Sequence, residues 1–124
     1  MILQALNENL TVCKVATVGD FDWNSELYFI GKTDEELSLV CKTADAPSHT
    51  LAREDGWKGL RIQGELDFSL IGILAELSAV LAAHKIGLFA VSTYNTDYLL
   101  VKEENFAAAV CALEKAGHQV TEVP

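Results

Sequence analysis

Basic residues are scarce in this sequence of 124 residues, which has 9 lysines and arginines against 18 aspartates and glutamates. The net charge is therefore −9 at neutral pH. Proteins that bind nucleic acid present basic patches, and anionic membranes attract basic segments, so we expect neither kind of partner. Solubility explains the acidic excess more simply than an acidic docking surface does.

Cysteines are also few, and none belongs to a CxxC pair. Cys13, Cys41 and Cys111 each have apolar neighbours, and this odd number predicts neither a disulfide framework nor a zinc site. We expect buried free thiols in a reducing cytosol. The first residues lack the basic segment of a signal peptide, and the apolar run over 68–83 is too short for a membrane span and contains Glu76. These features favour a cytoplasmic protein.

Catalytic motifs are missing as well, because the sequence has no P-loop, no GxGxxG and no nucleophile elbow. His49, His84 and His118 have neither metal-ligand spacing nor catalytic neighbours, so we assign them surface or capping roles. Lys58 and Arg61 are too few to form an anion-binding patch. We therefore expect no catalytic residue, no metal site and no cofactor.

Apolar residues, in contrast, are abundant. They make up 50% of the sequence, which is enough for a packed core in one domain or in two very small subdomains. The first 56 residues predict three strands, over 10–18, 26–30 and 36–41, followed by a connector over 43–56.

The remaining residues predict two helices among four strands. Apolar residues recur with a period of 3.6 over 70–81, which predicts a helix capped by Ser69 or Asp67. The other predicted elements are a strand over 57–62, a strand over 86–93, a turn over 94–97, a strand over 98–102, a helix over 103–116 and a strand over 118–123. This βαββαβ order predicts an α+β fold of the ferredoxin-like type, with four strands in one antiparallel sheet and two helices on one face.

We expect two parts, a strand-rich segment over 1–56 and a βαββαβ domain over 57–124. The first part is too poor in helix for a full second copy of the same plan, and a reduced copy is compatible with its three strands. A weak internal echo supports the reduced copy, because Thr33-Asp34 precedes ELSLV much as Thr96-Asp97 precedes YLLV.

Two stretches of the second part, SLIGILAELSAVLA (69–82) and STYNTDYLLV (92–101), resemble the ACT domain. The resemblance covers 57–124 and points to the tandem ACT branch, which includes small bacterial ACT proteins and the cytosolic arginine sensors of animals. The segment 1–56 is similar to the divergent ACT-like segment that precedes the typical one in those proteins. The family implies regulation rather than chemistry, because ACT domains bind amino acids or other small metabolites, usually between two ACT units and near the loop joining the first strand to the first helix.

The resemblance also implies where a ligand would bind. The family's loop glycine matches Gly72 best and Gly64 second, and the ligand's carboxylate would meet backbone N–H groups at the helix start, where anions are favoured. In the arginine-sensing relatives, the turn that matches STYNTD also faces the ligand. The candidate ligand-binding residues are therefore Asp67, Ser69, Leu70, Ile71, Gly72, Thr93, Asn95, Thr96 and Asp97.

Structural roles compete with binding at several of these positions. Glycine inside a helix costs about 1 kcal/mol relative to alanine, so Gly72 serves either binding or tight packing. Asp67 and Ser69 are explained more simply as N-caps than as ligand contacts. Asp97 can pair with a ligand's amino group or cationic side chain, or it can simply belong to a β-turn over 94–97.

We therefore expect a non-catalytic regulatory module that binds an amino acid, forms a homodimer and acts on a protein partner that the sequence does not identify. Such coupling requires a ligand that binds two states differently. The alternative is a structural or interaction protein that keeps the fold, has lost the ligand and dimerises through exposed sheet edges. A small enzyme is the weakest of the three hypotheses, since the fold alone does not exclude catalysis but no catalytic set is present.

Overall fold

The computed structural model describes residues 1–19, 21–64 and 72–122. The chain divides into two compact units, one made of Met1–Asn7 with Lys58–Pro124 and the other of Glu8–Trp57. We call these the helical unit and the strand unit. The first seven residues group with the second half of the chain. The expected division into 1–56 and 57–124 instead placed them in the first part. As a division into domains, that expectation stays a prediction.

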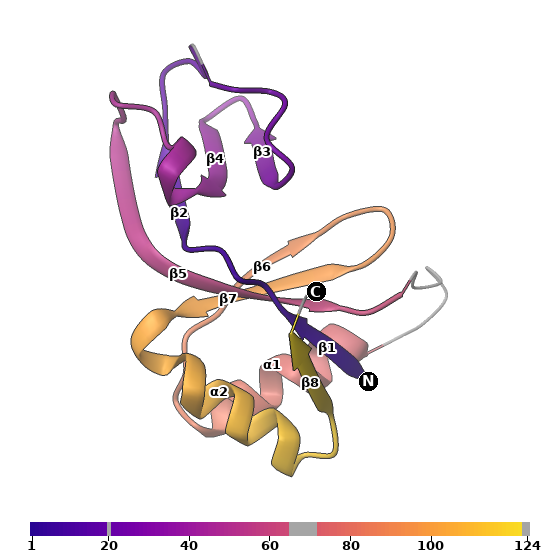
Figure 1. Cartoon of the computed structure of the whole chain (residues 1–124). Helices are drawn as coiled ribbons and strands as arrows, with labels where there is room; N and C mark the ends of the chain where they lie inside the picture. Colours follow the sequence, from indigo (N-terminus) through magenta and orange to yellow (C-terminus); the bar gives the residue numbers. More distant parts are fainter. Residues whose placement is uncertain (20, 65–71, 123–124) are drawn as a thin grey trace. The chain divides into compact units, whose positions relative to one another are not determined.

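The helical unit contains both α-helices, α1 (Ile73–Ala83) and α2 (Glu103–Lys115). Its strands are β1 (Ile2–Ala5), the C-terminal part of β5 (Ala52–Ile62), β6 (Phe89–Ser92), β7 (Asp97–Lys102) and β8 (Gln119–Glu122). Figure 1 shows α1 and α2 together on one side of β1, β5 and β7. The other face of these strands therefore carries no helix of this unit.

The sheet of the helical unit has the order β8-β1-β5-β7-β6. The expectation of four antiparallel strands is wrong in one respect, because β1 lies between β5 and β8, antiparallel to β5 and parallel to β8. The cause is apolar burial, since Leu3 and Ala5 of β1 lie buried in the core beside Ile62. The short apolar start of the chain thus completes the sheet under the helices.

Alternation along the strands and 3.6-residue periodicity along the helices build the core of this unit. Its buried members are Leu3, Ala5, Leu60, Ile62, Leu77, Leu81, Ile86, Leu99, Val101, Ala109 and Leu113. Burying one large aliphatic side chain contributes roughly 1.5–3 kcal/mol, so this cluster holds both helices on the sheet.

The start of α1 differs from the prediction. We expected a helix over 70–81 capped by Ser69 or Asp67, but α1 begins at Ile73 and its N-cap is Gly72. Gly72 has φ +82°, a left-handed conformation that costs other residues about 1–2 kcal/mol, which explains a glycine at this position. Ser69 and Asp67 lie outside the described residues. The second helix was expected over 103–116 and is observed as Glu103–Lys115.

The strand unit contains β2 (Leu10–Lys14), β3 (Tyr28–Lys32), β4 (Leu37–Lys42), a short 3₁₀ helix (Thr43–Asp45) and the N-terminal part of β5. Its order is β3-β4-β2-β5, with every neighbouring pair antiparallel. If β5 is counted as the fourth strand, this is the strand order of a ferredoxin-like sheet. No α-helix occurs among the residues described in Glu8–Trp57, so the strand unit is a reduced copy of the plan.

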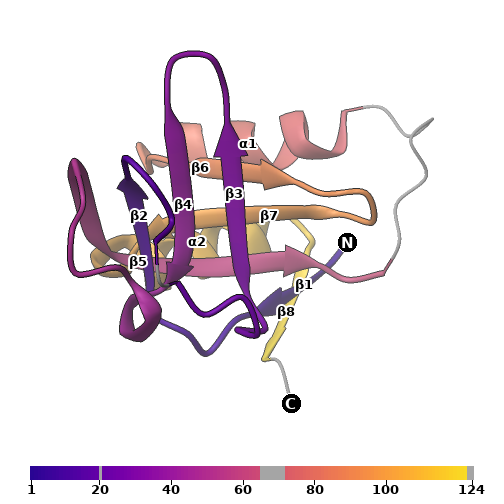
Figure 2. The same ribbon diagram turned by 90° about the horizontal axis from the view of Figure 1, so that it is seen from above.

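Each unit contains a β-hairpin with a similar turn, formed by β3 and β4 in the strand unit and by β6 and β7 in the helical unit. Figure 2 shows the hairpin of β3 and β4 clearly. In the strand unit the Thr33 N–H donates to the Glu36 carbonyl at 2.9 Å, and in the helical unit the Thr93 N–H donates to the Thr96 carbonyl at 2.8 Å. The following strands, β4 and β7, have the same length and the same burial pattern. Thr33 therefore corresponds to Thr93, and the echo read from the sequence, which matched Thr33 to Thr96, was shifted by three residues.

The cysteines lie in different environments. Cys13 and Cys41 are buried in the core of the strand unit, and burial raises the pKa of Cys41 to about 12 and also raises the pKa of Cys13. Cys111, which we expected to be buried, is exposed on α2. Its helical phase explains this, because Ala109 and Leu113 face the core and residue 111 lies about 200° around the helix from each.

A candidate ligand pocket in the helical unit

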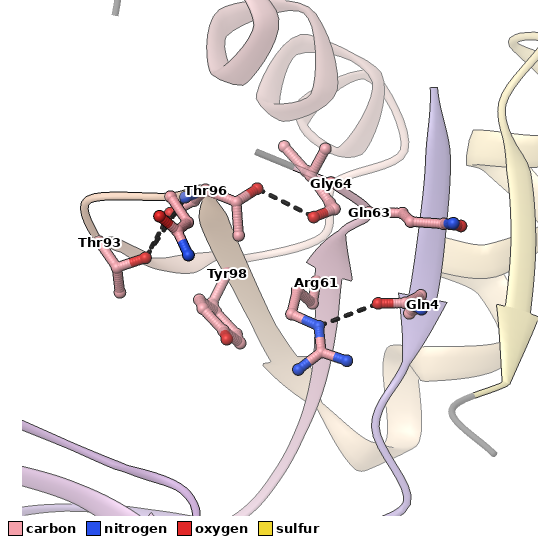
Figure 3. Close-up of a pocket in the computed structure, with 9 residues that line it drawn as sticks. Gln4, Arg61, Gln63, Gly64, Thr93, Thr96 and Tyr98 are labelled. Atoms are coloured by element: carbon pink, nitrogen blue, oxygen red, sulfur yellow. Dashed lines mark hydrogen bonds between the residues drawn. The ribbon is translucent and has the colours of Figure 1, made fainter. Parts of the chain in front are cut away.

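An open pocket of about 390 Å³ lies in the helical unit at the C-terminal end of β5 (Figure 3). Side chains from three adjacent strands, β1, β5 and β7, form its floor, and the turn between β6 and β7 forms a wall. The described residues that line it are Gln4, Arg61, Ile62, Gln63, Gly64, Thr93, Asn95, Thr96 and Tyr98.

The strand pleat explains why three polar side chains meet on the floor. Neighbouring residues of a strand point to opposite faces of a sheet. Residues on both sides of Gln4 and of Arg61, and the residue that follows Tyr98, are buried in the core beneath the helices. Gln4, Arg61 and Tyr98 therefore lie on the face that carries no helix of this unit.

Arg61 and Gln4 form the best-defined contact of the pocket. They are directly opposite each other in the pairing of β5 with β1, and the Arg61 Nε donates a hydrogen bond to the Gln4 Oε1 at 2.9 Å. Figure 3 shows the two terminal nitrogens of Arg61 on the far side of the guanidinium carbon from Nε, where they take no part in the bond to Gln4. Arg61 is the only charged side chain among the described lining residues. Because a guanidinium stays protonated at physiological pH, this part of the lining is cationic.

The turn from Thr93 to Thr96 is held by its own hydrogen bonds. The Thr93 hydroxyl donates to the Thr96 carbonyl at 3.0 Å, and the Thr96 N–H donates to the Thr93 Oγ1 at 3.4 Å. The Thr96 hydroxyl is buried and donates to the Ile62 carbonyl at 2.9 Å, which joins the turn to the end of β5. Asn95 is exposed beside these bonds, at the rim of the pocket.

The structure brings three of the predicted binding residues, Thr93, Asn95 and Thr96, into one pocket. Gly64, the second candidate for the family's loop glycine, lines the same pocket with φ +92°. Since the Thr96 hydroxyl already donates to the backbone of β5, this residue positions the pocket wall.

The other predicted residues lie elsewhere. Asp97 begins β7, and Gly72 caps α1, and neither is among the described lining residues. The predicted residues Asp67, Ser69, Leu70 and Ile71 lie outside the described residues. Ligand contact stays a prediction for these six residues and for Thr93, Asn95 and Thr96 alike.

Sequence reasoning missed the floor of the pocket. It gave Arg61 no binding role, and it assigned no function to Gln4 or Tyr98. One signal was available for Arg61, because a charged residue between two apolar ones in a strand must point away from the core. The partnership with Gln4 had no such signal, since it depends on the register between β1 and β5.

His118 is a second departure from expectation, because it is buried rather than on the surface. Its Nε2 lies 3.5 Å from an oxygen of Glu76, whose side chain is exposed, and neither ring nitrogen has a hydrogen bond within the described residues.

In the part of the chain that the structure describes, no group of three or more His, Cys, Asp or Glu side chains is arranged to hold a metal. No helix of 1–19, 21–64 or 72–122 is long and apolar enough to cross a membrane.

Solved structures show how widely this fold occurs. The chain superposes on the protein Atu0741 of Agrobacterium tumefaciens with a TM-score of 0.89 and 27% identity, covering 99% of this chain and 93% of that one. It superposes on the regulatory subunit of aspartate kinase from Thermus thermophilus with a TM-score of 0.67, covering 93% of this chain and 96% of that one. The identity in the second case is 9%, so that likeness concerns the fold alone.

Sequence comparison gives the family. The cytosolic arginine sensor for mTORC1 subunit 1 of Homo sapiens is 35% identical over 60 residues, which cover 48% of this chain. The match spans only 18% of that sensor. The family model described as the ACT domain matches residues 52–115, which is just over half of the chain. This chain belongs to the ACT domain family.

Proposed function

We propose that this chain is a non-catalytic, cytoplasmic regulatory module that binds an amino acid in the pocket at the end of β5. Two findings support a regulatory role, namely the membership of this chain in the ACT domain family and its similarity to a protein named as an arginine sensor. The observation that carries the proposal is the pocket itself, where polar side chains from three strands and a hydrogen-bonded turn converge on one open volume. Few, precisely placed polar groups in a concave site are typical of small-ligand sites.

The buried thiols fit a role without catalysis. Because the pKa values of Cys13 and Cys41 are raised by burial, both thiols are protonated at neutral pH and are poor nucleophiles. In the proposed mechanism the ligand changes the association of the chain with a second copy or with a protein partner. This requires that the ligand bind one association state more tightly than the other.

The test is a thermal-shift panel of the twenty amino acids at millimolar concentration, with the full chain. A ligand at about 100 times its dissociation constant stabilises the folded state by about 2.7 kcal/mol, which raises the melting temperature by several degrees in a protein of this size. Asn95→Ala, in the pocket wall, should remove the shift. A shift that survives Asn95→Ala but disappears in Asp97→Ala would place the ligand outside this pocket, and a flat panel would refute amino acid binding.

One observation favours the alternative of an interaction protein. Among the strands that the structure describes, β3 pairs with β4 alone and is an edge strand, and its residues Ile30, Gly31 and Lys32 are exposed. An exposed edge can pair with a second copy of the chain. In this case light scattering coupled to size exclusion would show a dimer that no amino acid alters, and Ile30→Lys would convert it to a monomer.

A further inference from the structure

We propose that the pocket selects its ligand by charge, with Arg61 binding the side-chain carboxylate of the ligand, so that acidic amino acids bind and cationic ones are rejected. This inference rests on the proposed function and narrows it to a ligand class. The proposed preference for acidic ligands differs from the ligand in the name of the human relative, which is called an arginine sensor.

The guanidinium of Arg61 is held in place before any ligand arrives. Its Nε is fixed by the Gln4 Oε1 at 2.9 Å, across the register pair that joins β5 to β1. The bond at Nε restrains the guanidinium, and the terminal nitrogens, which take no part in that bond, lie on the far side of the guanidinium carbon from Nε (Figure 3). A planar fork of two N–H donors matches the two oxygens of a carboxylate, which is the geometry of bidentate arginine–carboxylate pairs.

The remaining described lining supplies partners for the rest of an amino acid. Amide groups of Gln63 and Asn95 offer both donors and acceptors. No described lining residue is an aspartate or glutamate, although acids outnumber bases two to one in the whole chain. The described lining therefore offers a ligand ammonium group neutral oxygens, and Arg61 is the one charged side chain among its described residues.

Charge repulsion gives the direction of selectivity. Two like charges about 4 Å apart repel enough to lower affinity about fivefold even with the dielectric of water, and more in a partly closed pocket. A hydrogen-bonded charge pair removed by mutation typically lowers affinity about 10- to 100-fold. Aspartate or glutamate should therefore bind at least about fivefold more tightly than arginine or lysine.

The experiment is titration calorimetry on the full chain with four probes, namely L-aspartate, L-glutamate, L-arginine and L-lysine, at 0.05 and 0.3 M salt. Arg61→Gln should weaken binding of the acidic probes at least about tenfold, and Arg61→Lys, which keeps the charge but loses the fork, should fall between. Arg53→Gln is the matched control, because Arg53 lies on the same strand with its Nε bonded to Asp55 at 2.8 Å, outside the pocket. It should bind like the unmodified chain.

Circular dichroism establishes that each variant is folded. If Arg61→Gln does not fold, Gln4→Leu takes its place, since it removes the acceptor at Nε and should weaken the acidic probes severalfold. Arginine binding as tightly as aspartate, or full affinity in Arg61→Gln, would overturn the charge selection while leaving amino acid binding intact. If neither these probes nor any other amino acid binds, the proposed function fails together with the inference.

Discussion

The hydroxyl of Thr96 provides the sharpest test of how the pocket wall is held. Thr96 is 6% exposed, and its Oγ1 donates to the Ile62 carbonyl at 2.9 Å. Thr96→Val replaces the hydroxyl by a methyl group of similar size, so packing is nearly unchanged and the hydrogen bond is lost. The net value of a buried hydrogen bond is about 1 kcal/mol, and a carbonyl left without this donor raises the cost to about 2 kcal/mol.

The predicted change is large enough to measure. Unfolding entropy is about 2.1 cal/mol/K per residue, or roughly 260 cal/mol/K for 124 residues, so 1–2 kcal/mol corresponds to about 4–8 °C in melting temperature. Both α-helices lie in the helical unit, whereas Trp23 and Trp57 lie in the strand unit. Helical circular dichroism therefore reports the unit that contains Thr96, and tryptophan fluorescence reports the other.

Thr121→Val is the matched control, because Thr121 is half-buried on β8 of the same unit and its side chain has no hydrogen bond among the described residues. It should leave the melting temperature within about 1 °C. A Thr96→Val variant as stable as the unmodified chain would refute the structural role assigned to the hydroxyl. Loss of ligand affinity without loss of stability would instead make Thr96 a direct ligand contact.

Three further predictions follow from single residues. Gly72→Ala should cost about 1–2 kcal/mol in chemical unfolding through its φ of +82° alone, because an added Cβ meets no atom within 4 Å, whereas Gly87→Ala, equally open but without positive φ, should cost little. The pKa of Cys41 is raised from 9.0 to about 12, so the unfolded thiol ionises first and stability is lost as pH rises above 9, by about 2 kcal/mol at pH 10.5. Cys41→Val should remove this part of the stability loss at alkaline pH, and Cys111→Val should not. If the free energy of unfolding, measured with urea, fell equally steeply with rising pH in both variants, the assignment to Cys41 would be contradicted. His118→Leu at pH 8 should raise stability by about 1 kcal/mol, since the ring nitrogens have no hydrogen bond within the described residues, and a lower melting temperature would show that the imidazole is satisfied.

Local signals in the sequence were sufficient for the helices and for most strands. The apolar period of 3.6 located α1 and α2 to within three residues, because each helix buries one face on the sheet. The strands that were not predicted correctly are those that form by pairing with strands far away in the sequence. β1 has only four residues and pairs with β8 at the other end of the chain, and β5 begins at Ala52, where the charged run Arg53–Asp55 suggested a connector. Those residues are exposed, and their pairing with β2 rather than any apolar pattern makes them a strand.

The candidate site also has two parts. One part can be recognised from a contiguous sequence motif, and the other forms only through the register between paired strands. The turn at Thr93–Thr96 is contiguous, so its resemblance to a family motif was visible in the sequence. Arg61 and Gln4 are 57 residues apart and meet only because β1 enters the sheet beside β5. The two parts join where the Thr96 hydroxyl holds the Ile62 carbonyl, one residue after Arg61. A variant in the turn and a variant on the floor should therefore affect the same ligand, and binding that responds to Asn95→Ala but not to Arg61→Gln would assign recognition to the turn alone.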